Sequence, residues 1–196
     1  MFELENKYWA QGYSRILGMD EVGRGALAGP VTVGGVIWRQ HVTGEGIRDS
    51  KALKPSERER VARYIRTEAE AFAIASRDQG YIDAHGIVQA IQSCQVEIIA
   101  KLNPDMLLLD AFLLPKAQCR VPQQAIVKGD QLSVSIAAAS IVAKVDRDRM
   151  MCELDAQFLG LGSHKGYGTR GHYAALALYG PCYLHRKSFL RQWSRV

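Results

Sequence analysis

The sequence lacks the features typical of disulfide-rich, zinc-ribbon, membrane and repeat proteins. Its 196 residues include four cysteines with no C-x-x-C pair, so neither a disulfide framework nor a thiolate zinc site is indicated. The longest apolar runs, 106–109 and 136–139, are far shorter than the ~20 residues of a membrane span. No repeat or low-complexity linker is present, and the polar start has no signal-peptide pattern. We therefore expect a soluble cytoplasmic protein without membrane contact.

Neither sign of charge is in large excess. The formal net charge is +5, which permits a nucleic-acid partner without establishing one. Apolar residues make up 47% of the chain and charged residues 23%, as in ordinary globular proteins. The length fits one domain, and we expect residues 1–196 to form it.

Hydrophobic periodicity predicts alternating strands and helices. The expected strands are 15–20, 30–38, 72–76, 106–109 and 125–127, and the expected helices are 55–71, 83–102, 135–158 and 170–179. Ser56 and Glu59 match a capping box at the start of the first helix. Small residues early in the third helix would allow close packing. This order predicts an α/β protein with a mixed sheet flanked by helices.

Four carboxylates stand where predicted strands end: Asp20, Glu21, Asp110 and Asp130. Adjacent strand residues face opposite sides, so Asp20 and Glu21 share a site only if the strand ends or bulges there. The following sequence, VGRG, would supply that break. The ordinary alternative for each carboxylate is a turn or a helix cap. If the sheet gathers these strand ends, the acidic pocket would need divalent cations to offset its own repulsion.

The glycine-rich segment after the first strand is a second candidate site. The spacing of Gly23, Gly25 and Gly29 is one residue longer than the dinucleotide-binding fingerprint, and a strand follows it, which argues against a nucleotide cofactor. Glycines let a backbone approach a ligand closely, and Arg24 can contact phosphate. A plain hairpin turn is the alternative.

Other polar residues support weaker interpretations. The spacing of His164, His172 and His185 matches no common zinc pattern. Asp146 and Asp148 face different sides of the predicted helix, and we expect at least one to be solvated or ion-paired. The arginines of the first predicted helix are expected to form a solvated face.

Six blocks of this chain resemble, in the same order, the signature blocks of ribonuclease HII, the bacterial type 2 ribonuclease H. They are DEVGRG with AGPV (20–31), DSKAL (49–53), LD (109–110), KGD with IAAASIVAKVDRD (128–148), HKGYGT (164–169) and HRKSF (185–189). The blocks span nearly the whole chain. One departure is Ala111, where the family often has glycine.

The resemblance implies a ribonuclease H-like fold, with a mixed five-stranded sheet, flanking helices and a helical C-terminal part. It implies an endoribonuclease that hydrolyses the RNA strand of RNA–DNA hybrids, including 5′ of single ribonucleotides embedded in duplex DNA. Its products would carry 3′-hydroxyl and 5′-phosphate ends. It also implies catalysis by Mn²⁺ or Mg²⁺ bound to Asp20, Glu21, Asp110 and Asp130.

The resemblance also implies a set of substrate contacts. The Gly23-Arg24-Gly25 loop would sense the 2′-hydroxyl that separates RNA from DNA. Tyr167 would pack on the sugar beside the junction, and Lys51 and Lys165 would lie near the phosphate backbone. We expect a monomer that acts in ribonucleotide removal and primer removal during DNA replication and repair.

Three alternatives stay open at this point. Ribonuclease HIII has an extra N-terminal domain and usually lysine in place of Arg24, whereas 19 residues precede Asp20 here. A DNA-specific nuclease of the same fold would cleave all-DNA duplexes. A non-catalytic module would bind hybrids through basic residues and would not need four carboxylates. The role of 112–123 is not predicted.

Overall fold

The computed structural model describes residues 2–40, 42–44, 46, 47, 50, 53–155 and 160–190. Its elements, in chain order, are α1 (Glu3–Ala10), β1 (Ile16–Val22), β2 (Val31–Ile37), α2 (Pro55–Glu68), β3 (Ala71–Arg77), α3 (Gln79–His85), α4 (Ile87–Leu102), β4 (Met106–Asp110), β5 (Gln123–Ile126), α5 (Gly129–Leu132), α6 (Val134–Asp155), α7 (Leu161–His164), α8 (Arg170–Tyr179) and the 3₁₀ turn η1 (Lys187–Phe189).

A mixed five-stranded sheet of order β3-β2-β1-β4-β5 forms the centre of the molecule. β1, β2 and β3 form an antiparallel meander, whereas β4 and β5 run parallel to β1. β1 is therefore the central strand, with the glycine-rich turn at its end and β4 at its side. The predicted α/β class and mixed five-stranded sheet are confirmed.

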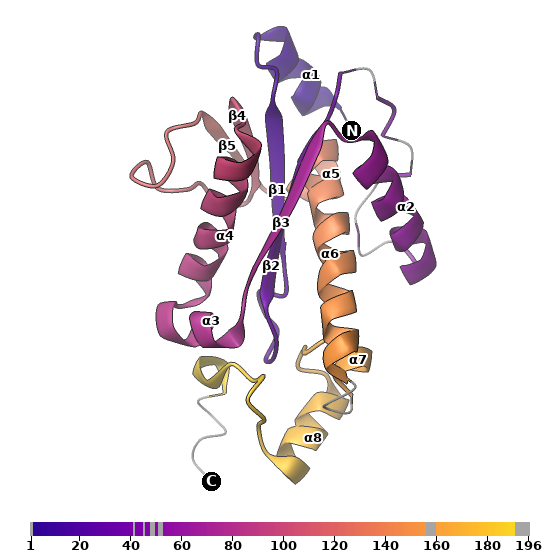
Figure 1. The fold of residues 1–196 in the computed structure, drawn as a ribbon, viewed down its shortest axis with the longest axis vertical. Helices are drawn as coiled ribbons and strands as arrows, with labels where there is room; N and C mark the ends of the chain where they lie inside the picture. Colours follow the sequence, from indigo (N-terminus) through magenta and orange to yellow (C-terminus); the bar gives the residue numbers. More distant parts are fainter. Residues whose placement is uncertain are drawn as a thin grey trace.

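Helices cover both faces of the sheet, as Figure 1 shows with the sheet near its edge. α3 and α4 lie on one face, over a core that includes Leu17, Leu107 and Ile98. α6 lies on the other face, with α2 packed on its outer side around Val61, Ile65 and neighbouring alanines of α6. Within the described residues, no helix is long and apolar enough to cross a membrane.

α6 approaches the sheet closely because neither side carries bulk at the contact. A Cβ at Gly18 would lie 2.4 Å from the carbonyl carbon of Ser135, and one at Gly34 would lie 2.3 Å from the carbonyl oxygen of Ala139. The alanines at the start of α6 are fully buried. The small residues of this helix thus serve the close packing that the sequence predicts.

The structure corrects two helix predictions. The helix expected at 83–102 is two helices, since Gly86 lies at φ +83°, a left-handed conformation that ends α3 before α4 begins. The capping box predicted at Ser56 and Glu59 is also wrong. Lys54 is the N-cap of α2 and makes no side-chain cap bond, while Pro55 begins the helix with its preset φ.

Other predicted boundaries change by a few residues. The helix expected at 55–71 is α2, which ends at Glu68, and Ala71 already belongs to β3. β1 does not stop at the acidic pair but runs on to Val22, which corrects the expected break. α6 is described to Asp155, so the last three predicted residues lie outside the described part.

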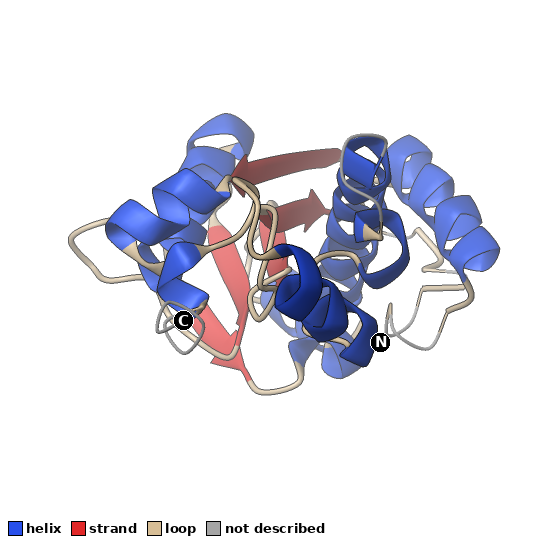
Figure 2. Ribbon diagram, turned by 90° about the horizontal axis from the view of Figure 1, so that it is seen from below, coloured by secondary structure: helices blue, strands red, loops and turns tan. Residues whose placement is uncertain are grey.

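The C-terminal part crosses one end of the sheet, as Figure 2 shows from below. His185 forms an isolated β-bridge with Ala28 in the glycine-rich turn. The amides of Lys187 and Ser188 donate to Asp83 in α3. The last described residues are thus attached both to the β1–β2 turn and to the α3 side of the molecule.

Candidate active site

Asp20 and Glu21 lie in the regular ladder between β1 and β2, opposite Gly34 and Val33. Their side chains therefore leave opposite faces of the sheet. Asp20 is on the α6 face, where the hydroxyl of Ser140 hydrogen-bonds its carboxylate. Glu21 is on the α4 face and lines a cavity there.

Asp110 ends β4, the parallel neighbour of β1, and brings a third carboxylate to the same sheet end. Its Oδ1 accepts a hydrogen bond of 2.8 Å from the amide of Gly129. It also lines the cavity that contains Glu21. Asp110, at the end of β4, thus lies close both to Gly129 and to the cavity that Glu21 lines.

The three carboxylates repel one another. Burial raises the pKa of Asp20 to about 7, and the charges of Glu21 and Asp110 act in the same direction, while the Ser140 hydrogen bond opposes them. Burial also raises the pKa of Glu21, again assisted by Asp110, while the Arg24 guanidinium opposes the rise. This acidic group is therefore costly in the absence of a cation.

Asp130 is connected to this group through Gly129, the residue that donates to Asp110. It is the second residue of the short helix α5 and is only 7% exposed. The structure therefore places Asp130 next to the residue whose amide donates to Asp110, and α5 packs against α6.

The donor set suits a hard divalent cation. Mg²⁺ and Mn²⁺ prefer carboxylate oxygens as ligands. A bound cation would also offset the repulsion among these carboxylates. Among the described residues, no three acidic, histidine or cysteine side chains are already gathered as metal ligands. Three of the carboxylates have protein partners, since Asp20 accepts from Ser140, Glu21 pairs with Arg24 at 3.1 Å and Asp110 accepts from Gly129. The residues fit a cation that would displace or share those bonds.

The two glycines of the Gly-Arg-Gly turn have different surroundings. Gly23 lies at φ +90°, and a Cβ there would be 2.1 Å from Nε of Arg147. A Cβ on Gly25 would meet nothing within 4 Å. Gly23 is thus required by the protein's own packing, whereas Gly25 faces space that a ligand can use.

Phe112 is a feature of the site that the sequence did not predict. Its side chain is 64% exposed, and the guanidinium carbon of Arg24 lies 5.3 Å from its ring centroid. With Leu113 it lines the cavity of about 240 Å³ beside Glu21 and Asp110. An aromatic residue two positions after a site carboxylate is the one sequence signal that could have pointed to it.

Tyr167 lies near the glycine-rich turn. The carbonyl of its neighbour Gly166 accepts from the amide of Leu27 at 2.8 Å. Nζ of Lys144 lies 5.9 Å and the guanidinium carbon of Arg147 lies 5.2 Å from the Tyr167 ring centroid. Two motifs more than 130 residues apart in the chain thus meet at the end of β1.

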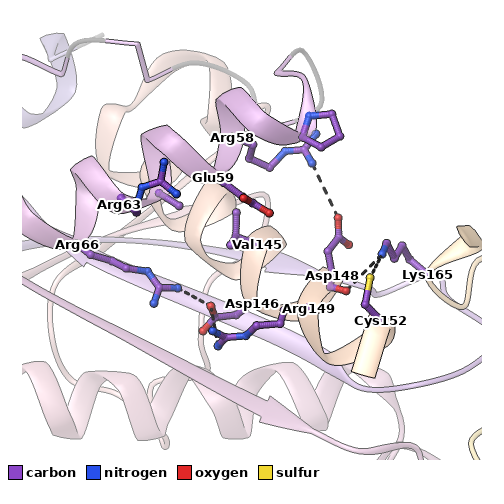
Figure 3. A pocket seen from close by; sticks show the side chains of 12 residues that line it. Arg58, Glu59, Arg63, Arg66, Val145, Asp146, Asp148, Arg149, Cys152 and Lys165 are labelled. Carbon is purple, nitrogen blue, oxygen red and sulfur yellow. Dashed lines mark hydrogen bonds and ion pairs between the residues drawn. The ribbon is translucent and has the colours of Figure 1, made fainter. Parts of the chain in front are cut away.

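Lys165 points toward Cys152 in a different part of the molecule from the cavity beside Glu21, as Figure 3 shows for its side chain. Its Nζ lies 2.6 Å from Sγ of Cys152 and 3.4 Å from the Asp148 carbonyl, in a groove of about 630 Å³ between α2 and α6. Lys51 lies outside the described residues. The hydroxyl of Ser50 bonds that of Ser140 at 3.0 Å, which places Ser50 two hydrogen bonds from Asp20.

The groove in Figure 3 also contains the two aspartates of α6. Asp146 pairs with Arg66 and Arg149, and Asp148 pairs with Lys144 at 2.6 Å. The prediction that at least one of them is ion-paired is confirmed.

Three histidines that the spacing left unconnected come together behind Tyr167. The His164 and His172 rings stack at 4.0 Å, and Nε2 of His172 lies 2.9 Å from Nε2 of His185. Because a carbonyl only accepts, Nδ1 of His172 donates to the Tyr167 oxygen at 2.9 Å. Its Nε2 then accepts from His185, whose Nδ1 accepts from the Cys182 amide at 3.0 Å. The stacked and hydrogen-bonded rings thus support the Tyr167 backbone.

A family model described as Ribonuclease HII matches residues 17–192. The chain belongs to the ribonuclease HII family. A ribonuclease HII of Geotalea uraniireducens is 45% identical over 96% of this chain and 88% of its own length. One of Solibacter usitatus is 46% identical over 95% of this chain and 82% of its own length. The chain is therefore a metal-dependent ribonuclease, a hydrolase.

Solved structures agree with the fold. The structure of a PCNA complex of ribonuclease HII from Archaeoglobus fulgidus is similar with a TM-score of 0.75 and 28% identity, covering 88% of this chain and 93% of that one. Ribonuclease H2 of Pyrococcus horikoshii gives a TM-score of 0.73 at 22% identity, over 93% of this chain and all of that one. The ribonuclease H-like fold implied by the motifs is confirmed.

Proposed function

We propose that this ribonuclease hydrolyses the RNA strand of RNA–DNA hybrids and also cleaves 5′ of a single ribonucleotide embedded in duplex DNA. Its products would carry 3′-hydroxyl and 5′-phosphate ends. The observation that carries the proposal is the meeting of Asp20, Glu21 and Asp110 beside a glycine turn with open space at Gly25. The substrate would be a hybrid or a ribonucleotide-containing DNA, and one copy of the chain, forming one domain over 1–196, would suffice.

Asp20, Glu21, Asp110 and Asp130 are proposed to hold Mn²⁺ or Mg²⁺. Such a cation supplies Lewis-acid chemistry at the scissile phosphate when bound. A structure of a ribonuclease HIII from the same fold class was solved in complex with Mn²⁺. The chain's own part is to gather the carboxylates, with Ser140 and the Gly129 amide orienting Asp20 and Asp110.

The proposed substrate contacts follow from the turn and the loop beside it. Gly25 leaves space for a ribose, and Gly23 and Arg24 carry amides of the same turn. Tyr167 would pack on the sugar. Lys165 and Lys51 would approach the phosphate backbone, which requires Lys165 to leave its contact with Cys152.

The first test is cleavage of an end-labelled DNA duplex with one ribonucleotide, with Mn²⁺ or Mg²⁺ and with EDTA. We expect a metal-dependent cut 5′ of the ribonucleotide and none in the all-DNA duplex. Cleavage only of long RNA tracts would contradict the junction specificity. Cleavage of all-DNA would indicate a DNA nuclease instead.

Asp20→Asn is expected to lower kcat by at least about 100-fold, because the carboxylate group loses a charged cation ligand. The matched control is Asp146→Asn, which removes an aspartate of α6 that pairs with arginines outside the site. The Kd for a labelled hybrid should change little in either variant. An active Asp20→Asn protein would remove Asp20 from the proposed metal site.

A further inference from the structure

Two fully buried arginines lie beneath the glycine-rich turn. Arg147 of α6 and Arg186, just before η1, are each 0% exposed. Arg147 donates to the carbonyl oxygens of Pro30 at 2.9 Å, Lys165 at 2.9 Å and Ala28 at 3.4 Å. The turn is thus held from inside by a side chain of α6.

Arg186 holds the same turn from the C-terminal side. Its Nε donates to the Gly29 carbonyl and its Nη1 to the Arg24 carbonyl, both at 3.0 Å. Together the two guanidiniums bind four carbonyls of residues 24–30. The turn is therefore fixed by charged donors from two distant parts of the chain.

Neither arginine has a carboxylate partner among the described residues. A buried guanidinium without an ion pair is expensive, because carbonyl dipoles and the ring faces of Tyr167 and Phe189 offset its lost hydration only in part. Nη2 of Arg186 has no hydrogen-bond partner at all in the described structure. Burial lowers the pKa of Arg186 to about 10, assisted by Arg147, so Arg186 remains charged at neutral pH. Apolar side chains would stabilise this core at lower cost, so the pair calls for a reason beyond packing.

The carbonyl groups and the amide groups of the turn therefore have different partners. The arginines take up carbonyls on the inner side, and the Arg147 guanidinium fills the space that a Cβ of Gly23 would need. Among the described residues, the amides of Gly23, Arg24 and Gly25 have no protein acceptor. Three consecutive amide groups are thus left to a ligand, beside the open space at Gly25.

We propose that Arg147 and Arg186 are positioning residues, which fix the carbonyls of the turn so that its amides present a preformed site to the ribose of the substrate. The inference rests on the proposed function and deepens it. Arg147 also donates to the Lys165 carbonyl and lies beside the Tyr167 ring, so it sets the turn and the Tyr167 loop in one geometry. Specificity for ribonucleotides then depends on two residues that the substrate does not touch.

The test uses Arg147→Lys and Arg186→Lys, which keep the charge but replace the planar set of donors with one ammonium. The matched control is Arg77→Lys, a partly buried arginine that bonds Ser93 and Glu97 on the α4 side. Each protein is assayed for kcat and KM on the single-ribonucleotide duplex and for Kd with an all-DNA duplex. Thermal unfolding gives the folded fraction.

For both turn variants we expect kcat/KM to fall about 10- to 100-fold, because a displaced turn no longer fits the ribose. The Kd for all-DNA should stay within about twofold of the wild type, since backbone contacts lie elsewhere. The control should keep both values. A parallel loss of both values, in proportion to unfolding, would overturn the proposal in favour of a purely structural role, as would failure of both variants to fold.

Amide hydrogen exchange without substrate separates this inference from the proposed function. The turn variants should exchange faster over 23–30, with α4 unchanged. Unchanged exchange in the turn would overturn the inference even if the wild type cleaves ribonucleotide-containing DNA. A wild type that cleaves no hybrid would refute the proposed function instead, whatever the exchange of the turn.

Discussion

At the scale of single residues, the turn offers a matched pair of glycines. Gly23→Ala should destabilise the fold by about 1–3 kcal/mol, because it places a Cβ against Arg147 in a left-handed conformation. Gly25→Ala should fold normally, since its Cβ meets no protein atom, yet lose activity on a single ribonucleotide. Urea unfolding and the cleavage assay check both. A Gly25→Ala enzyme with full activity would show that substrate does not approach there.

Ala111 is another residue with an unfavourable conformation, at φ +63° directly after Asp110. Alanine pays about 1 kcal/mol or more in this region, where glycine does not. The glycine often found there in the family has this physical reason. Ala111→Gly should raise the free energy of unfolding by about 0.5–1 kcal/mol and keep activity, as urea titration and the cleavage assay would show. A loss of stability would mean that unfolded-chain entropy outweighs the relieved strain.

At the scale of elements, the sequence predicts those helices and strands whose bounds depend on their own residues. α8 matches its predicted range, and β4 ends at Asp110, because an apolar run or a helical period defines each. The α3–α4 break was missed because one glycine interrupts a pattern that is helical on both sides. Asp20 and Glu21 needed no bulge to reach one site, since the strand end is approached from both faces. The histidine group depends on how the C-terminal segment docks, which no spacing reveals.

That docked segment should respond to acid. Burial lowers the pKa of His164 to about 4, well below its unfolded value of 6.5, so the neutral ring stabilises the fold above pH 6.5 and this contribution is lost as pH falls toward 4. The stability difference between wild type and His164→Gln should therefore shrink from pH 7.5 to pH 5. The raised pKa of Asp20 acts in the opposite sense but is common to both proteins, so it cancels. Urea unfolding at both pH values measures this, with exposed His85→Gln as control. A difference that does not change with pH would contradict it.

At the scale of the whole molecule, an acidic site lies in a chain of net charge +5. Binding of a hybrid should therefore depend on phosphate contacts made away from the carboxylates. With the Asp20→Asn protein, which we expect to bind without rapid cleavage, the logarithm of the association constant should fall linearly with the logarithm of salt concentration, by about 0.9 per phosphate neutralised. Fluorescence anisotropy between about 50 and 200 mM salt, where losses of affinity are large, gives this slope. Salt-independent binding would exclude a backbone-dominated interface.

The hydrogen bond between Arg186 and Arg24 spans 162 residues. During synthesis on the ribosome, the turn therefore emerges long before the arginine that supports it. A nascent chain that stops before residue 186 already carries all four acidic residues but has an unfinished turn. Efficient cleavage would thus begin only after residue 186 has been added, and a product terminated before it would be a poor enzyme rather than an unselective one.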